Sequence, residues 1–179
     1  PYFFNLGAVS DGAGFAQLGR AYADAILAAE IEFDVLFGPA YKGIPIAVAT
    51  ATALAERGVH VGVAYNRKEA KDHGEGGMLV GAEVAGRVLL VDDVLTSGKA
   101  IRQSVDLIAQ TDASIVGTVI ALDRAELFDG GVTAVEALAS DLGVPIVSIA
   151  SVADIIEQVD DASLRQRMVE YQQQYCRVA

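Results

Sequence analysis

Several residue types that define particular protein classes are scarce in this sequence. It contains one cysteine, Cys176, which excludes an intrachain disulfide and a cysteine-based zinc site. Four prolines, no tryptophan and no low-complexity tract exclude a fibrous or linker protein. The longest apolar stretch, residues 43–55, is too short to cross a bilayer, and no signal-peptide pattern opens the chain. We therefore expect a cytoplasmic protein with no membrane partner.

Positive charge is also scarce. Thirteen Lys and Arg residues face 24 Asp and Glu residues, so the net charge is −11 and a broad nucleic-acid-binding face is excluded. With 179 residues, 53% of them hydrophobic, the chain can bury a core of its own, and we expect one domain over residues 1–179. The numbering opens at Pro1, so we expect the biological protein to begin further upstream.

Apolar runs alternate with segments of helical character along the chain. Unbroken apolar runs are typical of parallel strands that are covered on both faces. The alternation predicts an α/β fold with a mostly parallel central sheet flanked by helices, whose ligand lies beyond the carboxyl ends of the strands. The expected strands are residues 35–37, 59–65, 88–91, 115–122 and 144–149, and the expected helices are 15–29, 44–56, 99–110, 132–142, 152–158 and 162–174.

The strongest chemical signal follows the apolar run 88–91. Asp92 and Asp93 end this run, and a Thr-Ser-Gly turn then enters the next helix. Backbone N–H groups of residues 96–100 at a helix N-terminus favour a phosphate, and the two carboxylates suit sugar hydroxyls. This pattern indicates a ribose 5-phosphate site. The alternative is an acidic strand end followed by an ordinary N-cap at Thr96 or Ser97.

Two common phosphate motifs are absent. The Walker pattern fails because Gly98-Lys99 is followed by Ala100 and lacks its first glycine. The dinucleotide pattern fails because Gly12-Ala-Gly14 has Gln17 at its last position. A nucleotide P-loop and a dinucleotide turn are therefore both excluded.

Cations gather in residues 66–77. Arg67, Lys68, Lys71 and His73 precede three glycines in four positions. A mobile loop of this composition suits contact with a polyanion such as pyrophosphate. The alternative is a solvated surface loop.

Two weaker candidates also follow predicted strands. Lys42 comes after a Gly-Pro turn and could meet a second phosphate, or could simply be an exposed lysine. Arg124 could recognise a carboxylate or an imide edge through its planar guanidinium, or could pair with Asp123 or Glu126. His60 is expected to be structural, in an alternating strand.

These segments resemble a known family. Residues 88–98, Val-Leu-Leu-Val-Asp-Asp-Val-Leu-Thr-Ser-Gly, resemble the phosphoribosyl-pyrophosphate motif of the type I phosphoribosyltransferases. Residues 1–5, 37–45 and 66–77 are similar to those of the bacterial orotate phosphoribosyltransferases. The resemblance implies the type I phosphoribosyltransferase fold, with a small hood built from the N-terminal region and partly encoded before residue 1.

The resemblance also implies an activity. Such an enzyme transfers ribose 5-phosphate from phosphoribosyl pyrophosphate to orotate, giving orotidine 5'-monophosphate and pyrophosphate in pyrimidine (UMP) biosynthesis. Mg²⁺ is held mainly by substrate oxygens rather than by protein ligands. The implied assembly is a homodimer with shared active sites, in which Lys71 and His73 serve the neighbouring subunit.

The resemblance assigns residues to three roles. The implied catalytic residues are Lys71, His73 and Arg67. The implied phosphoribosyl-pyrophosphate contacts are Tyr41, Lys42, Arg67, Lys68, Lys71, His73, Asp92, Asp93, Val94, Leu95, Thr96, Ser97, Gly98, Lys99 and Ala100. The implied orotate contacts are Phe3, Phe4, Thr96 and Arg124. Lys99 departs from the family, which usually has a small hydroxyl residue there.

Three alternatives compete with this interpretation. A purine-base phosphoribosyltransferase is disfavoured by Arg124 and the Phe3-Phe4 pair, through the resemblance alone. A non-enzymatic regulator that senses phosphoribosyl pyrophosphate is disfavoured by Lys71 and the negative net charge. A signalling receiver domain would leave the cationic glycine-rich segment unexplained.

Overall fold

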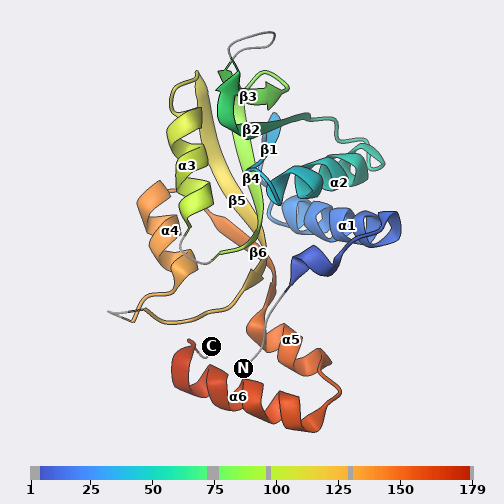
Figure 1. The fold of residues 1–179 in the computed structure, drawn as a ribbon, viewed down its shortest axis with the longest axis vertical. Coiled ribbons are helices and arrows are strands. Elements are labelled where there is room, and N and C mark those ends of the chain that lie inside the picture. The colour runs from blue at the N-terminus through green and yellow to red at the C-terminus, as the bar shows by residue number, and fades with distance from the viewer. Residues whose placement is uncertain (1–4, 72–76, 96–97, 129–130, 178–179) are drawn as a thin grey trace.

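Six strands form one sheet in the computed structural model, which describes residues 5–71, 77–95, 98–128 and 131–177, without the side chains of residues 70 and 71. The strand order is β3-β2-β1-β4-β5-β6, so β1 and β4 occupy the centre (Figure 1). The strands are β1 (Val35–Gly38), β2 (Gly62–Lys71), β3 (Gly77–Gly81), β4 (Gly86–Val94), β5 (Ala113–Asp123) and β6 (Ile146–Ser151).

All strand pairs are parallel except β2 with β3, which is antiparallel. Each parallel neighbour pair needs a crossover, and helices supply it. The predicted mostly parallel α/β sheet is confirmed. Because β1 and β4 are adjacent, the polar segments that follow them meet at one edge of the sheet.

Four helices cover the two faces of the sheet. Figure 1 shows α1 (Gly12–Ala28) and α2 (Gly43–Ala55) on one face, with α3 (Lys99–Ile108) and α4 (Ala134–Leu142) on the other. The side chains of β4 alternate accordingly: Leu89 and Val91 pack with α1 and α2, while Val88 and Leu90 pack with α3 and α4. Both faces are buried at residues 88–91, which explains why these four residues of the strand are all apolar.

Two further helices, α5 (Val152–Gln158) and α6 (Ala162–Tyr175), lie together at one end of the molecule (Figure 1). They bury a cluster of their own around Val152, Ile156 and Met168. A short 3-10 helix, η1 (Leu6–Ala8), precedes α1. None of the described helices combines the length and apolar character that a membrane span requires.

Local sequence signals explain where several helices begin. Asp11 caps α1 by accepting a hydrogen bond from the Gly14 N–H at 2.7 Å. Thr133 with Glu136, and Ser151 with Asp154, form capping boxes at the starts of α4 and α5. The predicted helices are confirmed to within about three residues at each end.

The structure corrects the predictions around β2. This strand starts at Gly62, so His60 lies before it and is exposed, not within an alternating strand. The strand then continues through residues 66–71, which were expected to be part of a loop, and pairs with β3, a strand the sequence analysis did not predict. The pattern was misleading because this hairpin is charged and exposed in part, so apolar alternation does not mark it.

Candidate active site

Two carboxylates mark the centre of the candidate site. Strand β4 continues through Asp92 and Asp93 to Val94, so both acids lie on a strand rather than after it. The N–H of Asp93 donates to Asp92 Oδ1 at 2.9 Å. Lys42, in the turn after β1, places its Nζ 2.5 Å from Asp93 Oδ2. The pairing of β1 with β4 therefore brings a lysine 51 residues away onto the acid pair.

The two acids sit in different surroundings. Burial raises the pKa of Asp92 to about 6, and the Asp93 charge adds to that, while the Asp93 N–H and Lys42 act against it. The hydrogen bond and charge of Asp93 in turn raise the pKa of Lys42, which keeps that side chain protonated. The pair thus combines one partly desolvated carboxyl group with one that is ion-paired.

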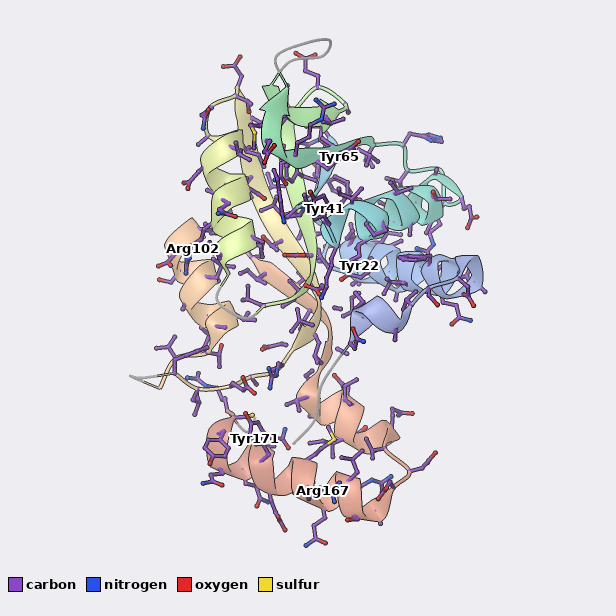
Figure 2. All side chains as sticks on the ribbon, viewed as in Figure 1. Tyr22, Tyr41, Tyr65, Arg102, Arg167 and Tyr171 are labelled. Carbon is purple, nitrogen blue, oxygen red and sulfur yellow. The ribbon has the colours of Figure 1, made fainter. Side chains whose placement is uncertain are left out.

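Tyr22 of α1 binds the backbone of the acid pair. Its side chain is fully buried, and its hydroxyl donates to the backbone oxygen of Asp92 at 2.7 Å (Figure 2). Burial, together with the charges of Asp92 and Asp93, raises the pKa of Tyr22, so it stays a neutral donor. This contact joins α1 to the carboxyl end of β4.

A cavity of about 310 Å³ lies between the acids and the N-terminus of α3. Gly98 precedes this helix at φ 66°, a left-handed conformation that glycine adopts readily, and none of the described side chains caps the helix. Uncapped N–H groups and the helix dipole suit an anion there. The cavity is lined by Asp92, Asp93, Val94, Leu95, Gly98, Lys99, Ala100, Ile101 and Gln103.

The N-cap alternative at Thr96 or Ser97 is wrong in its position, because Gly98 occupies the N-cap of α3. The structures of Thr96 and Ser97 lie outside the described residues, as do those of Phe3, Phe4 and His73. The backbone of Lys71 ends β2, but its side chain is likewise outside the description. Their assigned roles stay predictions.

The turn after β1 is tied to β2. The N–H of Ala40 donates to Asn66 Oδ1 at 2.9 Å, and Lys68 Nζ lies 4.8 Å from the centre of the Tyr41 ring. A Cβ on Gly38 would lie 2.1 Å from the Gly43 carbonyl oxygen, so only glycine permits this tight turn. Tyr41 and Lys68, singled out in the sequence, are thus brought together, and Lys42 follows directly.

Arg67 lies on β2, and Lys99 lies at the start of α3. Arg67 is half-buried on β2, next to the exposed Lys68. Lys99 is exposed in the first turn of α3 and lines the cavity beside the acids. Of these cations, Lys42 contacts Asp93 and Lys99 lines the cavity beside the acids, while Lys68 lies against the Tyr41 ring.

Arg124 lies directly after β5. Its Nη2 is 2.5 Å from Glu126 Oε1, so the ion pair with Glu126 is confirmed, whereas Asp123 accepts a hydrogen bond from the Ala125 N–H instead. A cavity of about 290 Å³ opens beside it. Leu95 lines both this cavity and the one beside the acids, so the two adjoin. Its lining is Leu95, Asp123, Arg124, Ala125, Glu126, Phe128 and Ala134.

No group of three His, Cys, Asp or Glu side chains that could hold a metal ion occurs among the described residues. Asp92 and Asp93 do line the cavity beside α3. Mg²⁺ is commonly bound through one or two carboxylates together with phosphate oxygens, and this donor pair fits that habit.

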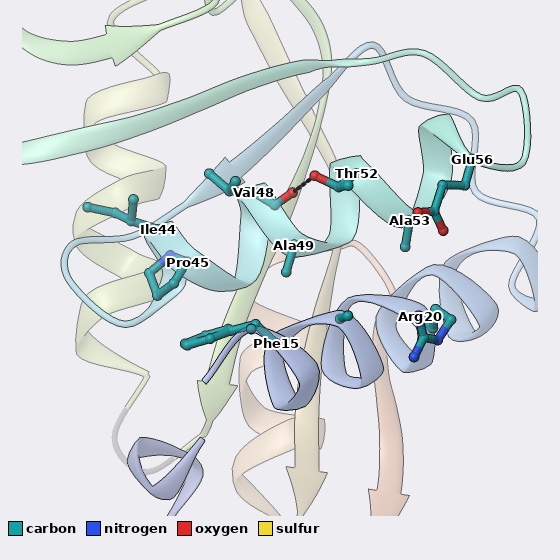
Figure 3. Close-up of a pocket in the computed structure, with 11 residues that line it drawn as sticks. Phe15, Arg20, Ile44, Pro45, Val48, Ala49, Thr52, Ala53 and Glu56 are labelled. Carbon is teal, nitrogen blue, oxygen red and sulfur yellow. Dashed lines mark hydrogen bonds between the residues drawn. The ribbon is translucent and has the colours of Figure 1, made fainter. Parts of the chain in front are cut away.

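A larger groove, of about 460 Å³, runs between α1 and α2 (Figure 3). Phe15 of α1 faces Pro45 and Ala49 of α2, and the charged side chains Arg20 and Glu56 stand toward one end. Its lining is otherwise almost wholly apolar and uncharged, so it does not suit a phosphorylated sugar.

Sequence reasoning missed three residues that support the site. Tyr22 was hidden because a buried tyrosine in an amphipathic helix looks like ordinary core. Asn66 was considered only as the start of a loop, and Glu126 only as a surface partner of Arg124. Each acts through a contact with a distant segment, which no local pattern signals.

Comparison with known protein sequences identifies a matching family and similar proteins within it. A family model described as "Phosphoribosyl transferase domain" matches residues 6–127. An orotate phosphoribosyltransferase of Pseudomonas putida (strain W619) is 52% identical over 170 residues, which cover 94% of this chain and 80% of that protein.

Solved structures of orotate phosphoribosyltransferases have a similar fold. The crystal structure of orotate phosphoribosyltransferase from Francisella tularensis has a TM-score of 0.86 and 34% identity, with 99% of this chain and 87% of that one covered. Orotate phosphoribosyltransferase of Mycobacterium tuberculosis H37Rv in complex with 5-phospho-alpha-D-ribosyl 1-diphosphate has a TM-score of 0.66 and 25% identity, with 86% and 83% covered.

The match is therefore not confined to one motif. It spans the acid pair on β4, the turn after β1 and the helices on both sides of the sheet. The chain belongs to the phosphoribosyltransferase family, and within it to the bacterial orotate phosphoribosyltransferases.

Proposed function

We propose that this chain transfers the ribose 5-phosphate group of phosphoribosyl pyrophosphate to orotate, giving orotidine 5'-monophosphate and pyrophosphate in pyrimidine biosynthesis. The observation that carries the proposal is a site with two ends, formed by two adjoining cavities that share Leu95. One end combines Asp92 and Asp93 with the open N-terminus of α3, and the other is bordered by Arg124. The names of the similar proteins support the same reaction.

In this proposal the cavity beside α3 holds the phosphorylated sugar. The backbone N–H groups of Lys99 and Ala100 would meet the 5-phosphate, where the helix dipole favours negative charge. Asp92 and Asp93 would accept hydrogen bonds from the two ribose hydroxyls. This use of the acids requires both to be ionised, which the ion pair between Lys42 and Asp93 favours.

The cations of the candidate site would hold the pyrophosphate. During transfer, the bond from C1 of the sugar to the pyrophosphate oxygen breaks, and pyrophosphate leaves with the electron pair. Lys42, Arg67 and Lys68 would stabilise the growing negative charge, joined by Lys71 and His73 as expected from the family resemblance. Asp92 and Asp93 would be the protein groups nearest to a Mg²⁺ ion bound mainly through substrate oxygens, and such an ion would supply further neutralisation of phosphate charge.

The base would sit at the other end of the site. A ring nitrogen of orotate would bond to C1 as the sugar–pyrophosphate bond breaks, and its proton would pass to the departing pyrophosphate. Arg124 would meet the polar edge of the base, since a guanidinium fits a carboxylate or an imide. Phe3, Phe4 and Thr96 stay proposed contacts from the resemblance.

The assembly and the location are proposed from the resemblance and from the composition. A homodimer with shared active sites is supported by the family resemblance, and a cytoplasmic location by the single cysteine, which excludes intrachain disulfides. Neither is needed for the chemistry of the described residues.

The direct test is loss of orotate absorbance when the protein is mixed with phosphoribosyl pyrophosphate and Mg²⁺. Turnover with orotate, and none with hypoxanthine, guanine or adenine, is expected. Turnover with a purine base alone would favour the purine-specific alternative. Binding of phosphoribosyl pyrophosphate in calorimetry without turnover of any base would favour a regulator.

A further inference from the structure

The C-terminal end of the chain is joined to the segment that follows β5. The N–H of Leu127 donates to the carbonyl oxygen of Tyr175 at 2.8 Å, and the N–H of Arg177 donates to that of Ala125 at the same distance. Glu126, between these two anchored residues, forms an isolated antiparallel bridge with the same stretch. The end of α6 therefore forms a short strand pair with this segment.

Side chains continue this connection to Arg124. Tyr171 of α6 donates its hydroxyl to Glu126 Oε1 at 2.7 Å, and that oxygen lies 2.5 Å from Arg124 Nη2 (Figure 2). The hydrogen bond to Glu126 raises the pKa of Tyr171 to about 12, so the phenol remains a donor at neutral pH. One carboxylate thus links the tyrosine of α6 to the guanidinium.

The backbone next to Arg124 is held as well. Ala125 has a φ of 51°, a left-handed conformation that is unfavourable for alanine. Its N–H is held by Asp123 Oδ1 at 2.8 Å, and its side chain packs against the cluster that α5 and α6 bury. Strained backbone of this kind persists only where the surroundings fix it, and it is enriched at functional sites.

We propose that Glu126 and Tyr171 are positioning residues that orient Arg124 toward the base, so that α6 forms part of the base-binding site. The inference rests on the proposed function, in which Arg124 contacts orotate. A guanidinium on a long side chain loses rotamer freedom when it binds, and a carboxylate that already orients it reduces that loss.

Charge alone predicts the opposite effect of Glu126. Its carboxylate lies beside the site proposed for orotate, which is itself an anion, so simple repulsion would weaken binding. Replacing Glu126 by Gln would then tighten orotate binding if the residue acted through charge alone. If it positions Arg124, the same replacement weakens orotate binding. The sign of the change therefore separates the two roles.

The experiment compares three variants of the full chain with the unaltered protein. Glu126→Gln and Tyr171→Phe are expected to raise the KM for orotate about fivefold and about threefold, and to leave the KM for phosphoribosyl pyrophosphate within about twofold. The matched control is Asp141→Asn, which removes the carboxylate of the Arg102–Asp141 ion pair between α3 and α4. The control is expected to leave both KM values unchanged.

The double variant adds a second readout. Because Tyr171 acts through Glu126 in this proposal, Glu126→Gln with Tyr171→Phe should raise the orotate KM no more than Glu126→Gln alone. An unchanged or lower orotate KM in Glu126→Gln would overturn the inference, as would equal rises in both KM values. If Glu126→Gln fails to fold, Tyr171→Phe decides, since it removes only the hydroxyl.

Failure of the proposed function has a different signature. It would show as absent orotate turnover and absent orotate binding in the unaltered protein, and the inference would then fall with it. Normal turnover by the unaltered protein, with variants that match it in both KM values, would overturn the positioning role and leave the proposed function standing.

Discussion

At the scale of single residues, the site places two neighbouring carboxylates directly after the fully buried residues 88–91 of the central strand β4. Ionising a carboxyl group there is unfavourable because surrounding atoms exclude water. Lys42 offsets this at Asp93 through an ion pair, and the Asp93 N–H offsets it in part at Asp92. The two acids therefore remain available for a polar ligand although they follow four apolar residues of β4.

Ionisation of the buried Asp92 carboxyl group should lower the free energy of unfolding as the pH rises. Its pKa is about 6 in the fold against an ordinary 3.8, so the folded protein binds more protons than the unfolded chain between those values. The free energy of unfolding therefore falls as pH rises through this window. Asp92→Asn should raise it at pH 8 by roughly 1–3 kcal/mol, and should change it little at pH 4.

Urea denaturation at the two pH values measures this effect. Asp106→Asn, on the exposed face of α3, serves as the control and should show no such difference. A decrease in stability at pH 8 for Asp92→Asn would mean that the carboxylate is better stabilised in the fold than its burial implies.

Asp93→Asn should weaken binding of phosphoribosyl pyrophosphate about tenfold or more, because one charge-assisted hydrogen bond to the sugar is lost. Stability should change by less than about 1 kcal/mol, since its partner Lys42 is 64% exposed. Calorimetry with phosphoribosyl pyrophosphate measures the affinity. Unchanged affinity would remove Asp93 from the sugar site.

At the scale of elements, the hairpin of β2 and β3 differs most from the sequence-based expectation. Its charged residues predict a loop when considered alone, yet residues 66–71 extend β2. Asn66 and Lys68 then reach back to the turn after β1 through Ala40 and Tyr41. The cations are therefore held by a strand that is itself tied to the neighbouring turn.

The packing of α1 on α2 depends on a close approach at Gly19. A Cβ added there would lie 2.3 Å from the Ala49 carbonyl oxygen, while one added at Gly12 would meet nothing within 4 Å. Gly19→Ala should lower the free energy of unfolding by about 1–3 kcal/mol, because backbone must shift. Gly12→Ala, the matched control at the start of the same helix, should be neutral or stabilising by up to about 1 kcal/mol.

Chemical denaturation followed by circular dichroism measures both variants. A loss of stability that is equal in the two glycine variants would contradict the role assigned to the close contact at Gly19.

At the scale of the whole molecule, the charge distribution is uneven. The net charge is −11, yet the cations Lys42 and Lys99 lie beside the two acids of the candidate site. A polyanionic substrate is repelled by most of the surface and attracted at the site. The apolar groove between α1 and α2 lies outside this cationic region.

Shared active sites can be tested with two variants, Lys71→Ala and Asp93→Asn, at a phosphoribosyl pyrophosphate concentration low enough that neither variant alone has appreciable activity. If Lys71 acts on the neighbouring subunit, a hybrid of Lys71→Ala and Asp93→Asn chains contains one complete site. Random mixing should then restore roughly a quarter of full activity, since about half of the dimers are hybrids with one working site of two. The mixture is assayed after subunit exchange, and each variant alone is the control. Activity no higher than the separate variants would place Lys71 in its own subunit's site.

The α/β sheet, several helix starts and the acid pair of this protein can be predicted from local sequence patterns. Alternation of buried strands and helices predicts the α/β sheet, and short-range caps such as Thr133 with Glu136 mark helix starts. Asp92 and Asp93 are visible as a pair because they are adjacent in the chain. Such features depend on neighbours within a few residues, so the order of amino acids alone determines them.

Only the tertiary structure decided which distant residues support the site. Lys42 meets Asp93 across 51 positions, Tyr22 meets Asp92 across 70, and Tyr171 meets Glu126 across 45. These pairs exist because of the order of strands in the sheet and the return of α6 to the end of β5. The secondary-structure propensities of short segments do not determine the strand order, because that order is set by packing of the whole core.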